Sequence, residues 1–317
     1  MAVIENAKIT VVGAGSVGAA TAYASLIRGS ARKVALYDIN AAKVEAEALD
    51  LAHGSLFTGS SEITGSADIA VTEGSHVVIV TAGAAQRPGQ TRLELVGTNA
   101  RIFRSMIPQL VEASPHAVFV IVSNPCDVLT LLAQEQTGLP PERVFASGTV
   151  LDTSRLRWRL AELAGVAARS VHAHIVGEHG DTEFPLWSSA AIGPVPLLDW
   201  KRDGGALTRG ELDQVAHEVR TAAYKVIEGK GATNYAIGLS AMRIAEAVLR
   251  DERAVLPVST VLTDFHGLSD VALSVPSIVG SSGAFPIHET RFSDEELGLL
   301  HASAETTKAT AAQVRED

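Results

Sequence analysis

The sequence predicts an α/β protein, with a doubly wound parallel sheet in the first half of the chain and a mixed α+β domain after it. Short apolar runs alternate with helical patterns up to about residue 150, which is typical of strand–helix–strand units. These runs do not alternate with polar residues, as expected for strands covered by helices on both faces. The pattern changes near residue 150, and a length of 317 residues suits two domains of about 150 residues each.

In the first half we expect strands at residues 9–12, 34–37, 77–80, 118–122 and 144–146. Helices are expected at residues 16–28, 41–53, 93–113 and 126–136. Pro108 lies inside the third of these helices and should kink or break it, because proline lacks the N–H that an interior position donates.

In the second half we expect a helix at residues 153–164, a strand at 171–176 and a polar loop at 177–183. Helices at 209–228 and 234–250 follow, and then strands around 255–264 and 271–279. A last helix opens at Ser293, which forms a capping box with Glu296. These elements predict domains at residues 1–150 and 151–317.

Composition limits the class of protein. A net charge of −10 argues against a nucleic-acid binder. No apolar stretch approaches the ~20 residues that cross a bilayer, and no leader segment is recognised. The single cysteine, Cys126, excludes an intramolecular disulfide and favours a cytoplasmic location. No base motif accompanies this thiol, so we expect it to pack in the core.

A Gly-Ala-Gly-Ser-Val-Gly motif at residues 13–18 follows the first strand and opens the first helix. Gly13 permits the turn, Gly15 lets the backbone approach a pyrophosphate, and Gly18 permits close helix–strand packing. Asp38 ends the second strand, where it would bind the ribose hydroxyls and repel a 2′-phosphate. The motif alone could be a tight turn and Asp38 a helix cap, but together they predict a Rossmann-type domain that binds NAD.

Ligands of such sheets lie beyond the carboxyl ends of the strands. The residues at those ends that we expect near the cofactor are Gly83, Ala84, Val122, Ser123, Asn124 and Ser147.

Four polar clusters follow, at residues 86–92, 123–127, 151–155 and 177–181. With the glycine motif, the segments Ser-Asn-Pro (123–125), Leu-Asp-Thr-Ser-Arg (151–155) and Gly-Glu-His-Gly-Asp (177–181) resemble the lactate/malate dehydrogenase family. The resemblance covers essentially the whole chain. It implies reversible NADH-dependent reduction of a 2-oxo acid, with a cofactor domain followed by a catalytic domain.

The resemblance also assigns roles. His179 matches the general acid/base, and Asp152 matches the partner that orients its ring. Arg155 matches the arginine that binds the substrate carboxylate, and Arg92 the loop arginine that polarises the carbonyl. The alternatives are a surface histidine and a structural Asp152–Arg155 ion pair on one helix face.

Five further positions match the family with less specificity. Asn124 resembles a residue that contacts substrate and nicotinamide, although a strand-end turn would also suit it. Thr233 resembles a pocket-wall residue, although it could equally cap the next helix. Val17, Lys43 and Ser105 match positions near the cofactor.

Gln86 lies at the position that, in this family, contacts the substrate side chain. Malate dehydrogenases carry arginine there, which pairs with the second carboxylate of oxaloacetate. A neutral glutamine would leave that carboxylate unpaired at a cost of several kcal/mol, so the resemblance favours pyruvate and L-lactate. Arg87 could take the place of Gln86 if the loop shifts by one residue. Malate, another 2-hydroxy acid or a catalytically silent NAD-binding protein remain alternatives.

Secondary features concern regulation and assembly. Arg157 and His172 match positions that bind fructose 1,6-bisphosphate in many bacterial members of the family, although both could be ordinary interface residues. The resemblance also implies a homotetramer. His172 and His174 share a strand face near His179, but we expect no metal site because acidic and cysteine ligands are missing.

Overall fold

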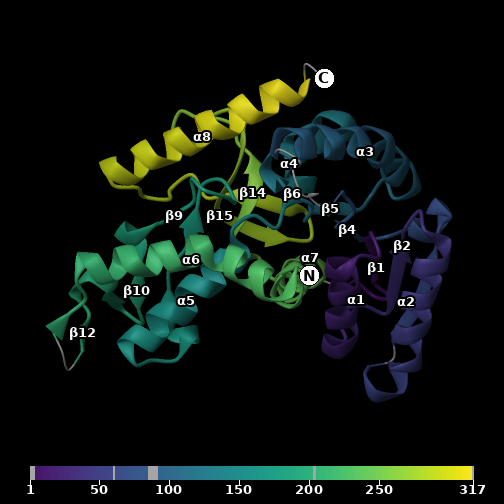
Figure 1. Ribbon diagram of the computed structural model, residues 1–317, viewed down its shortest axis with the longest axis horizontal. Coiled ribbons are helices and arrows are strands. Elements are labelled where there is room, and N and C mark those ends of the chain that lie inside the picture. Colours follow the sequence, from purple (N-terminus) through teal and green to yellow (C-terminus); the bar gives the residue numbers. More distant parts are fainter. Residues whose placement is uncertain (1–3, 60, 85–91, 203–204, 316–317) are drawn as a thin grey trace.

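The computed structural model describes residues 4–59, 61–84, 92–202 and 205–315, with only the backbone at 92–94. Its centre is a sheet with the order β16-β15-β14-β6-β5-β4-β1-β2-β3 in the described residues (Figure 1). The strands are β1 (Lys8–Val12), β2 (Lys33–Tyr37), β3 (Glu62–Ser66), β4 (Val77–Val80), β5 (Val118–Ile121), β6 (Val144–Ala146), β14 (Ala254–Val261), β15 (Ala272–Gly280) and β16 (Gly283–Pro286). Strands β1 to β6 run parallel, whereas β14, β15 and β16 join antiparallel.

Helices cover both faces of this sheet. They are α1 (Ser16–Arg28), α2 (Ala41–His53), α3 (Arg92–Ala113), α4 (Cys126–Thr137), α5 (Val150–Ala164), α6 (Arg209–Lys230), α7 (Tyr235–Leu249) and α8 (Asp294–Arg315). One core cluster joins α1 and α7 to the sheet, and a second joins α3, α4 and α8 to it. This burial on both faces is the physical reason that β4 and β5 consist of valine, isoleucine and phenylalanine alone.

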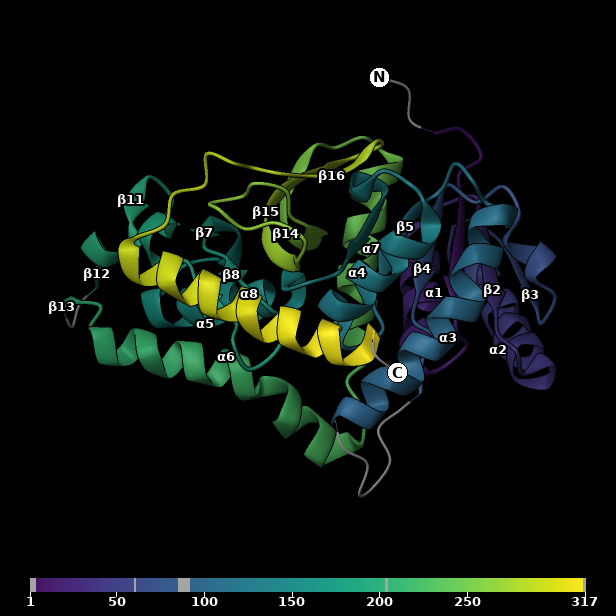
Figure 2. The ribbon, with the colours of Figure 1, turned by 90° about the horizontal axis from the view of Figure 1, so that it is seen from above.

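Small sheets gather beside α5 and α6, away from α1 and α2 (Figure 2). Strands β7 (Val171–His172), β10 (Ala191–Ile192) and β11 (Val195–Pro196) form one sheet. Strands β8 (Ile175–Val176) and β9 (Phe184–Pro185) form another, and β12 (Lys201–Arg202) pairs with β13 (Gly205–Ala206). Short 3₁₀ helices lie at Ser55–Phe57, Ile69–Thr72, Pro141–Arg143, Ala168–Ser170, Trp187–Ser189 and Leu197–Asp199.

The predicted fold class is confirmed, and the ends of α1, α2, β4 and β6 are those expected from the sequence. The capping box is present: the Ser293 N–H donates to Glu296 Oε2 at 2.8 Å, and the Glu296 N–H donates to Ser293 Oγ at 3.3 Å. The expected strands of the second half pair as antiparallel β14 and β15.

Two expectations about elements differ from the structure, and one strand was missed. Helix α3 is not broken at Pro108, because Phe103, Ile107 and Leu110 are fully buried and hold the helix on the sheet despite one lost hydrogen bond. The strand expected at 171–176 is divided between two sheets, because β7 pairs with β10 and β8 pairs with β9. The edge strand β3 was missed, since its half-exposed sequence Glu-Ile-Thr-Gly-Ser has no apolar run.

The sheet itself does not end at residue 150, because β14 pairs with β6 through Ser259 and Ala146. The division into residues 1–150 and 151–317 therefore stays a prediction. In the described residues, no helix combines the length and apolar character that a membrane crossing requires.

Candidate active site

The glycine motif forms a tight turn between β1 and α1. Gly13 has a φ of +100°, and a Cβ there would lie 2.8 Å from the Ala82 nitrogen. A Cβ on Gly18 would lie 1.8 Å from the Gly13 oxygen, so helix and strand approach too closely for any side chain. At Gly15 a Cβ would meet nothing within 4 Å. The turn is thus closed on the protein side and open on the outer side, where a pyrophosphate would bind at the N-terminus of α1.

A cleft of about 510 Å³ opens beside this turn, at the carboxyl ends of β1, β2 and β4. Six of the residues expected at the cofactor line it: Gly13, Gly15, Asp38, Lys43, Gly83 and Ala84. Residues that no sequence motif marks also line it, among them Tyr37, Ile39 and Asn40 from the β2 end, and Ile102 and Met106 from α3. The apolar members supply a surface on which a flat ring could pack.

Asp38 stands at the cleft in a fixed position. Its Oδ2 accepts a hydrogen bond from the Ala14 N–H at 2.7 Å, and its Oδ1 accepts one from the Asn40 N–H at 2.9 Å. Two backbone donors therefore hold a carboxylate where a ribose would lie. This negative charge suits ribose hydroxyls and opposes a 2′-phosphate, so the residues present fit NAD.

The other residues expected at the cofactor lie outside the lining of the cleft. Val17 and Gly18 belong to the first turn of α1, and Ser105 is exposed on α3, one residue from Met106. Val122 and Ser123 follow β5, and the Ser123 hydroxyl donates to the Ala82 carbonyl at 2.6 Å. Ser147 is buried directly after β6.

Asn99, which the sequence analysis missed, connects the loops at the ends of β4 and β5. Its Oδ1 accepts a hydrogen bond from the Ala84 N–H at 2.7 Å, and its Nδ2 donates to the Asn124 carbonyl at 2.9 Å. Asn124 is followed by Pro125 and α4, so this bridge ties the cofactor cleft to the start of α4. A buried asparagine in an otherwise apolar helix pattern is the signal that could have identified it.

A cluster of His179, Asp152 and Arg155 forms where α5 faces the loop after β8. His179 Nδ1 donates to Asp152 Oδ2 at 2.7 Å, and Arg155 Nη1 donates to Asp152 Oδ1 at 2.6 Å. The Asp152 side chain is 2% exposed, whereas the His179 side chain is 27% exposed and accessible to a substrate. Asp152 and Arg155 do form the ion pair of the alternative interpretation, and the same carboxylate also orients the histidine.

The electrostatics of the cluster favour a protonated histidine. Burial disfavours the charged ring, but the negative charge and the hydrogen bond of Asp152 outweigh it and raise the pKa of His179 to about 9. Burial also opposes ionisation of Asp152, but the charges of His179 and Arg155 and the hydrogen bonds they donate keep its pKa below the usual value. His179 is thus expected to hold a proton at neutral pH.

Two buried carboxyl groups beside His179 were not identified from the sequence. The His179 N–H donates to Asp127 Oδ2 at 2.8 Å, and burial raises the pKa of Asp127 to about 6. The carboxyl of Glu183 lies within 4.8 Å of the ligand atoms of both His179 and Asp152. That spacing would suit a divalent cation, but both oxygens of Asp152 already accept hydrogen bonds. The signal for Glu183 was its place in the histidine loop, four residues after His179.

Several expected substrate residues lie outside what the structure describes. Gln86 and Arg87 fall in the segment 85–91, which is outside the described residues. Arg92 opens α3, but its side chain is likewise outside the description. Thr233 is half-buried between α6 and α7, and Asn234, not Thr233, is the N-cap of α7.

The residues expected at an effector lie together on α5 and β7. Arg157 Nε donates to the Ala173 carbonyl at 3.0 Å, and its Nη2 lies 3.2 Å from His174 Nε2. His172, the residue before Ala173, is exposed. Cys126 is buried, and burial with the nearby Asp127 charge raises the pKa of its thiol, which disfavours the reactive thiolate.

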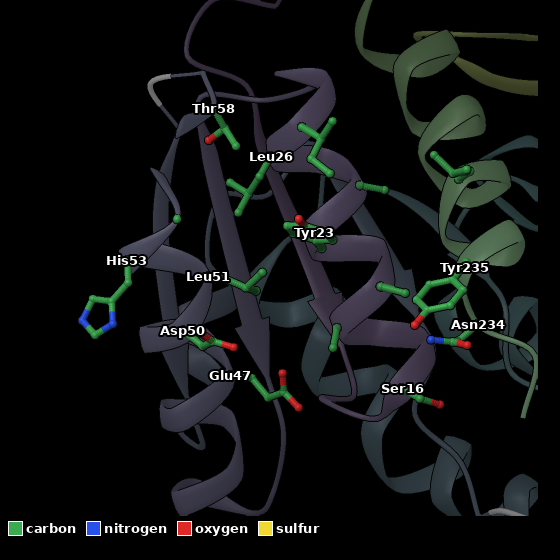
Figure 3. Close-up of a pocket in the computed structure, with 16 residues that line it drawn as sticks. Ser16, Tyr23, Leu26, Glu47, Asp50, Leu51, His53, Thr58, Asn234 and Tyr235 are labelled. Atoms are coloured by element: carbon green, nitrogen blue, oxygen red, sulfur yellow. The ribbon is translucent and has the colours of Figure 1, made fainter. Parts of the chain in front are cut away.

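A larger cavity, about 900 Å³, lies away from this chemistry, between α1, α2 and the start of α7. Figure 3 shows Tyr23, Leu51 and Tyr235 around it, with Glu47 and Asp50 at its α2 side. Tyr23 and Tyr235 are largely exposed there.

The open glycine turn with a fixed carboxylate for ribose, and the His–Asp–Arg cluster, define the class: an NAD-dependent dehydrogenase of 2-hydroxy acids. A family profile described as "lactate/malate dehydrogenase, NAD binding domain" matches residues 7–146. A second, "lactate/malate dehydrogenase, alpha/beta C-terminal domain", matches residues 149–317. The chain belongs to the lactate/malate dehydrogenase family.

Known proteins are similar over nearly the whole chain. An L-lactate dehydrogenase of Bifidobacterium animalis subsp. lactis is 47% identical over 312 residues, which cover 98% of both chains. An L-lactate dehydrogenase of Kosmotoga olearia is 44% identical over 315 residues, covering 98% of this chain and 97% of that one. The crystal structure of a minor L-lactate dehydrogenase from Enterococcus mundtii has a TM-score of 0.93 at 39% identity, covering 98% of this chain and 99% of the other.

Proposed function

We propose that this protein reduces pyruvate to L-lactate with NADH, and catalyses the reverse reaction. The observation that carries the proposal is the hydrogen bond of 2.7 Å between His179 and Asp152, beside Arg155. The cofactor supplies the hydride when bound. The curated relatives named L-lactate dehydrogenase support the choice of substrate.

Within this proposal each side chain has one task. His179 donates the proton of Nε2 to the developing alkoxide, while Asp152 holds Nδ1–H and stabilises the imidazolium. Arg155 donates a hydrogen bond from Nη1 to Asp152, and its other N–H groups could bind the substrate carboxylate. Arg92 would polarise the carbonyl, which rests on the family resemblance alone.

Gln86 would contact the substrate side chain, Asn124 would contact the substrate and the nicotinamide, and Thr233 would belong to the pocket wall. With glutamine at residue 86, the second carboxylate of oxaloacetate would lack a cation, so pyruvate is preferred. Malate dehydrogenase activity is the second candidate function, because Arg87 is adjacent. Oxidation of NADH measured with pyruvate and with oxaloacetate decides between them, and preference for oxaloacetate would refute the Gln86 argument.

The same assay tests whether the protein is an enzyme at all. Turnover of neither substrate, with NADH still bound, would favour a catalytically silent NAD-binding protein. His179→Gln is expected to abolish turnover and to leave NADH affinity within about twofold, because the cofactor cleft does not include this side chain. Loss of NADH binding instead would make His179 a structural residue.

We further propose that fructose 1,6-bisphosphate activates the enzyme at Arg157 and His172. Arg157 donates to the carbonyl of Ala173, the residue after the exposed His172, and the guanidinium of Arg157 would suit a phosphate group. Activity with and without this effector, in the wild type and in Arg157→Gln, tests the site. An equal response of both proteins would remove it.

The remaining parts of the proposal concern organisation. We propose that residues 1–150 bind NAD and residues 151–317 carry the catalytic groups, as the two family profiles suggest. A homotetramer follows from the family resemblance, and the exposed Tyr23, Ile27, Tyr235 and Leu239 on α1 and α7 offer an apolar surface for self-association. A cytoplasmic location is proposed from the single cysteine of the chain. Light scattering of the wild type and Ile27→Glu tests the assembly, which the variant should weaken.

A further inference from the structure

Glu183 is a buried carboxyl group for which the reaction described above has no task. It precedes β9, is 4% exposed, and its Oε1 accepts no hydrogen bond from the described residues. A buried carboxyl without partners is costly in its charged form. Its position beside the reacting histidine therefore needs a physical explanation.

The backbone fixes this position. The Glu183 N–H donates to the Gly180 carbonyl at 3.3 Å, and the Glu183 carbonyl accepts from Arg220 Nη2 at 3.0 Å. The Glu183 carboxyl, the His179 ring and the Asp152 carboxylate each place one ligand atom within 4.8 Å of the others. The carboxyl is therefore held against the acid/base pair and not against solvent.

Charge couples the three groups. Burial and the like charge of Asp152 raise the pKa of Glu183 to about 8, while the pKa of His179 is raised to about 9. The two groups titrate over the same alkaline range, and the negative charge of the ionised Glu183 is among the charges that raise the pKa of His179. An anion within about 5 Å of an imidazolium favours the charged ring. Glu183 thus becomes negative in the pH range where His179 would otherwise lose its proton.

We propose that Glu183 is a positioning residue that extends to higher pH the range in which His179 holds the proton for ketone reduction. It acts through its charge on the imidazole of His179. The charged and titratable groups that face this pair come from every neighbouring element, and they are Asp127 of α4, Asp152 and Arg155 of α5, Glu178 of the histidine loop, and Arg220 of α6. The inference rests on the proposed function of His179 as acid.

The test compares Glu183→Gln with the wild type. Glutamine keeps the shape of the side chain and removes its charge. For pyruvate reduction, the basic limb of kcat/KM should move down by about one pH unit, from near pH 9. The rate near pH 9 should fall several-fold while the rate at pH 6.5 changes little, since Glu183 is protonated there in the wild type. Glu305→Gln, an exposed substitution on α8, is the matched control and should leave the limb unchanged.

Two further measurements separate this effect from a structural one. Glu183→Asp keeps the charge and should place the limb between those of the wild type and the glutamine variant. NMR titration of the His179 ring, assigned through its absence in His179→Gln, should show the same order of pKa values without any turnover. This readout decides the inference even if the wild type fails to reduce pyruvate.

The expected shift is about one pH unit. The proposal would be overturned if, in Glu183→Gln, the basic limb of kcat/KM and the pKa of the His179 ring both stayed within about 0.3 pH unit of the wild-type values. An equal loss of activity at every pH would also overturn it, because that result describes a residue that only supports the loop. If Glu183→Gln does not fold, the aspartate variant and the ring titration still give the sign of the effect.

Discussion

Replacing Asp152 by asparagine is the most informative single change at this site. Asparagine keeps the shape and can still accept a hydrogen bond, but it removes the buried charge that faces both His179 and Arg155. The pKa of His179 is raised from 6.5 to about 9, because the charge and hydrogen bond of Asp152, together with the charges of Glu183 and Asp127, outweigh the opposing effect of burial. At about 1.4 kcal/mol for each tenfold change in proton affinity, this difference corresponds to about 3 kcal/mol.

Without that charge the pKa of His179 should fall toward 6.5, because burial remains and only the smaller attractions of Glu183 and Asp127 oppose it. If the pKa reached 6.5, the protonated fraction at pH 8 would fall about 30-fold. Asparagine also no longer enforces the ring tautomer or stabilises the imidazolium, so kcat/KM for pyruvate should fall by about 10²–10³. NADH affinity should stay within about twofold, since Asp152 does not line the cofactor cleft.

The assay is steady-state NADH oxidation between pH 6 and 10, with NADH affinity measured by fluorescence. Stability gives an independent check of sign. A histidine whose pKa rises on folding stabilises the native state below pH 6.5, and this contribution is lost as the pH rises through about 9. The wild type should therefore lose more stability over that range than Asp152→Asn. A variant that keeps its basic limb near pH 9 and its rate within threefold would refute the reasoning.

Three other changes have definite outcomes. Gly18→Ala should lower the free energy of unfolding by about 2–4 kcal/mol, because the added Cβ would lie 1.8 Å from the Gly13 backbone oxygen. Gly15→Ala should keep the melting temperature of the wild type but bind NADH at least tenfold more weakly. Equal melting temperatures of the two variants would contradict this expectation. Asp38→Ser should lower the preference for NADH over NADPH by about tenfold, as measured from kcat/KM with each, and an unchanged ratio would refute the role of its charge. Glu246→Gln should lower the free energy of unfolding in urea by about 2 kcal/mol at pH 7 and by much less at pH 3. Burial opposes the charge of Glu246, but the ion pair with Arg28 keeps the pKa of this carboxyl below its usual value. The contribution of the ion pair is therefore lost as the pH falls through that pKa.

Much of the first half of the fold was predictable because its signals are local. The buried runs at β4 and β5 are bounded by turn residues, and the glycine motif joins β1 to α1 in consecutive residues. Elements whose pattern depends on distant partners were less accessible. Residues 171–176 are apolar enough to form one strand, but they form two, because β7 pairs with β10 and β8 pairs with β9. Strand β3 forms because it pairs with the edge of the sheet at β2.

The site shows the same division. The sequence by itself determined which side chains could do the chemistry, because the motifs carrying Asp38, Asp152 and His179 match a family whose reaction needs them. Only the tertiary structure decided their surroundings: Asp127, 52 residues from His179 in sequence, accepts a hydrogen bond from the backbone N–H of His179, and Glu183 lies within 4.8 Å of both Asp152 and His179. Charge interactions act through space and depend on burial. The proton affinity of His179 therefore depends on how α4, α5 and the histidine loop pack together, which the sequence does not specify.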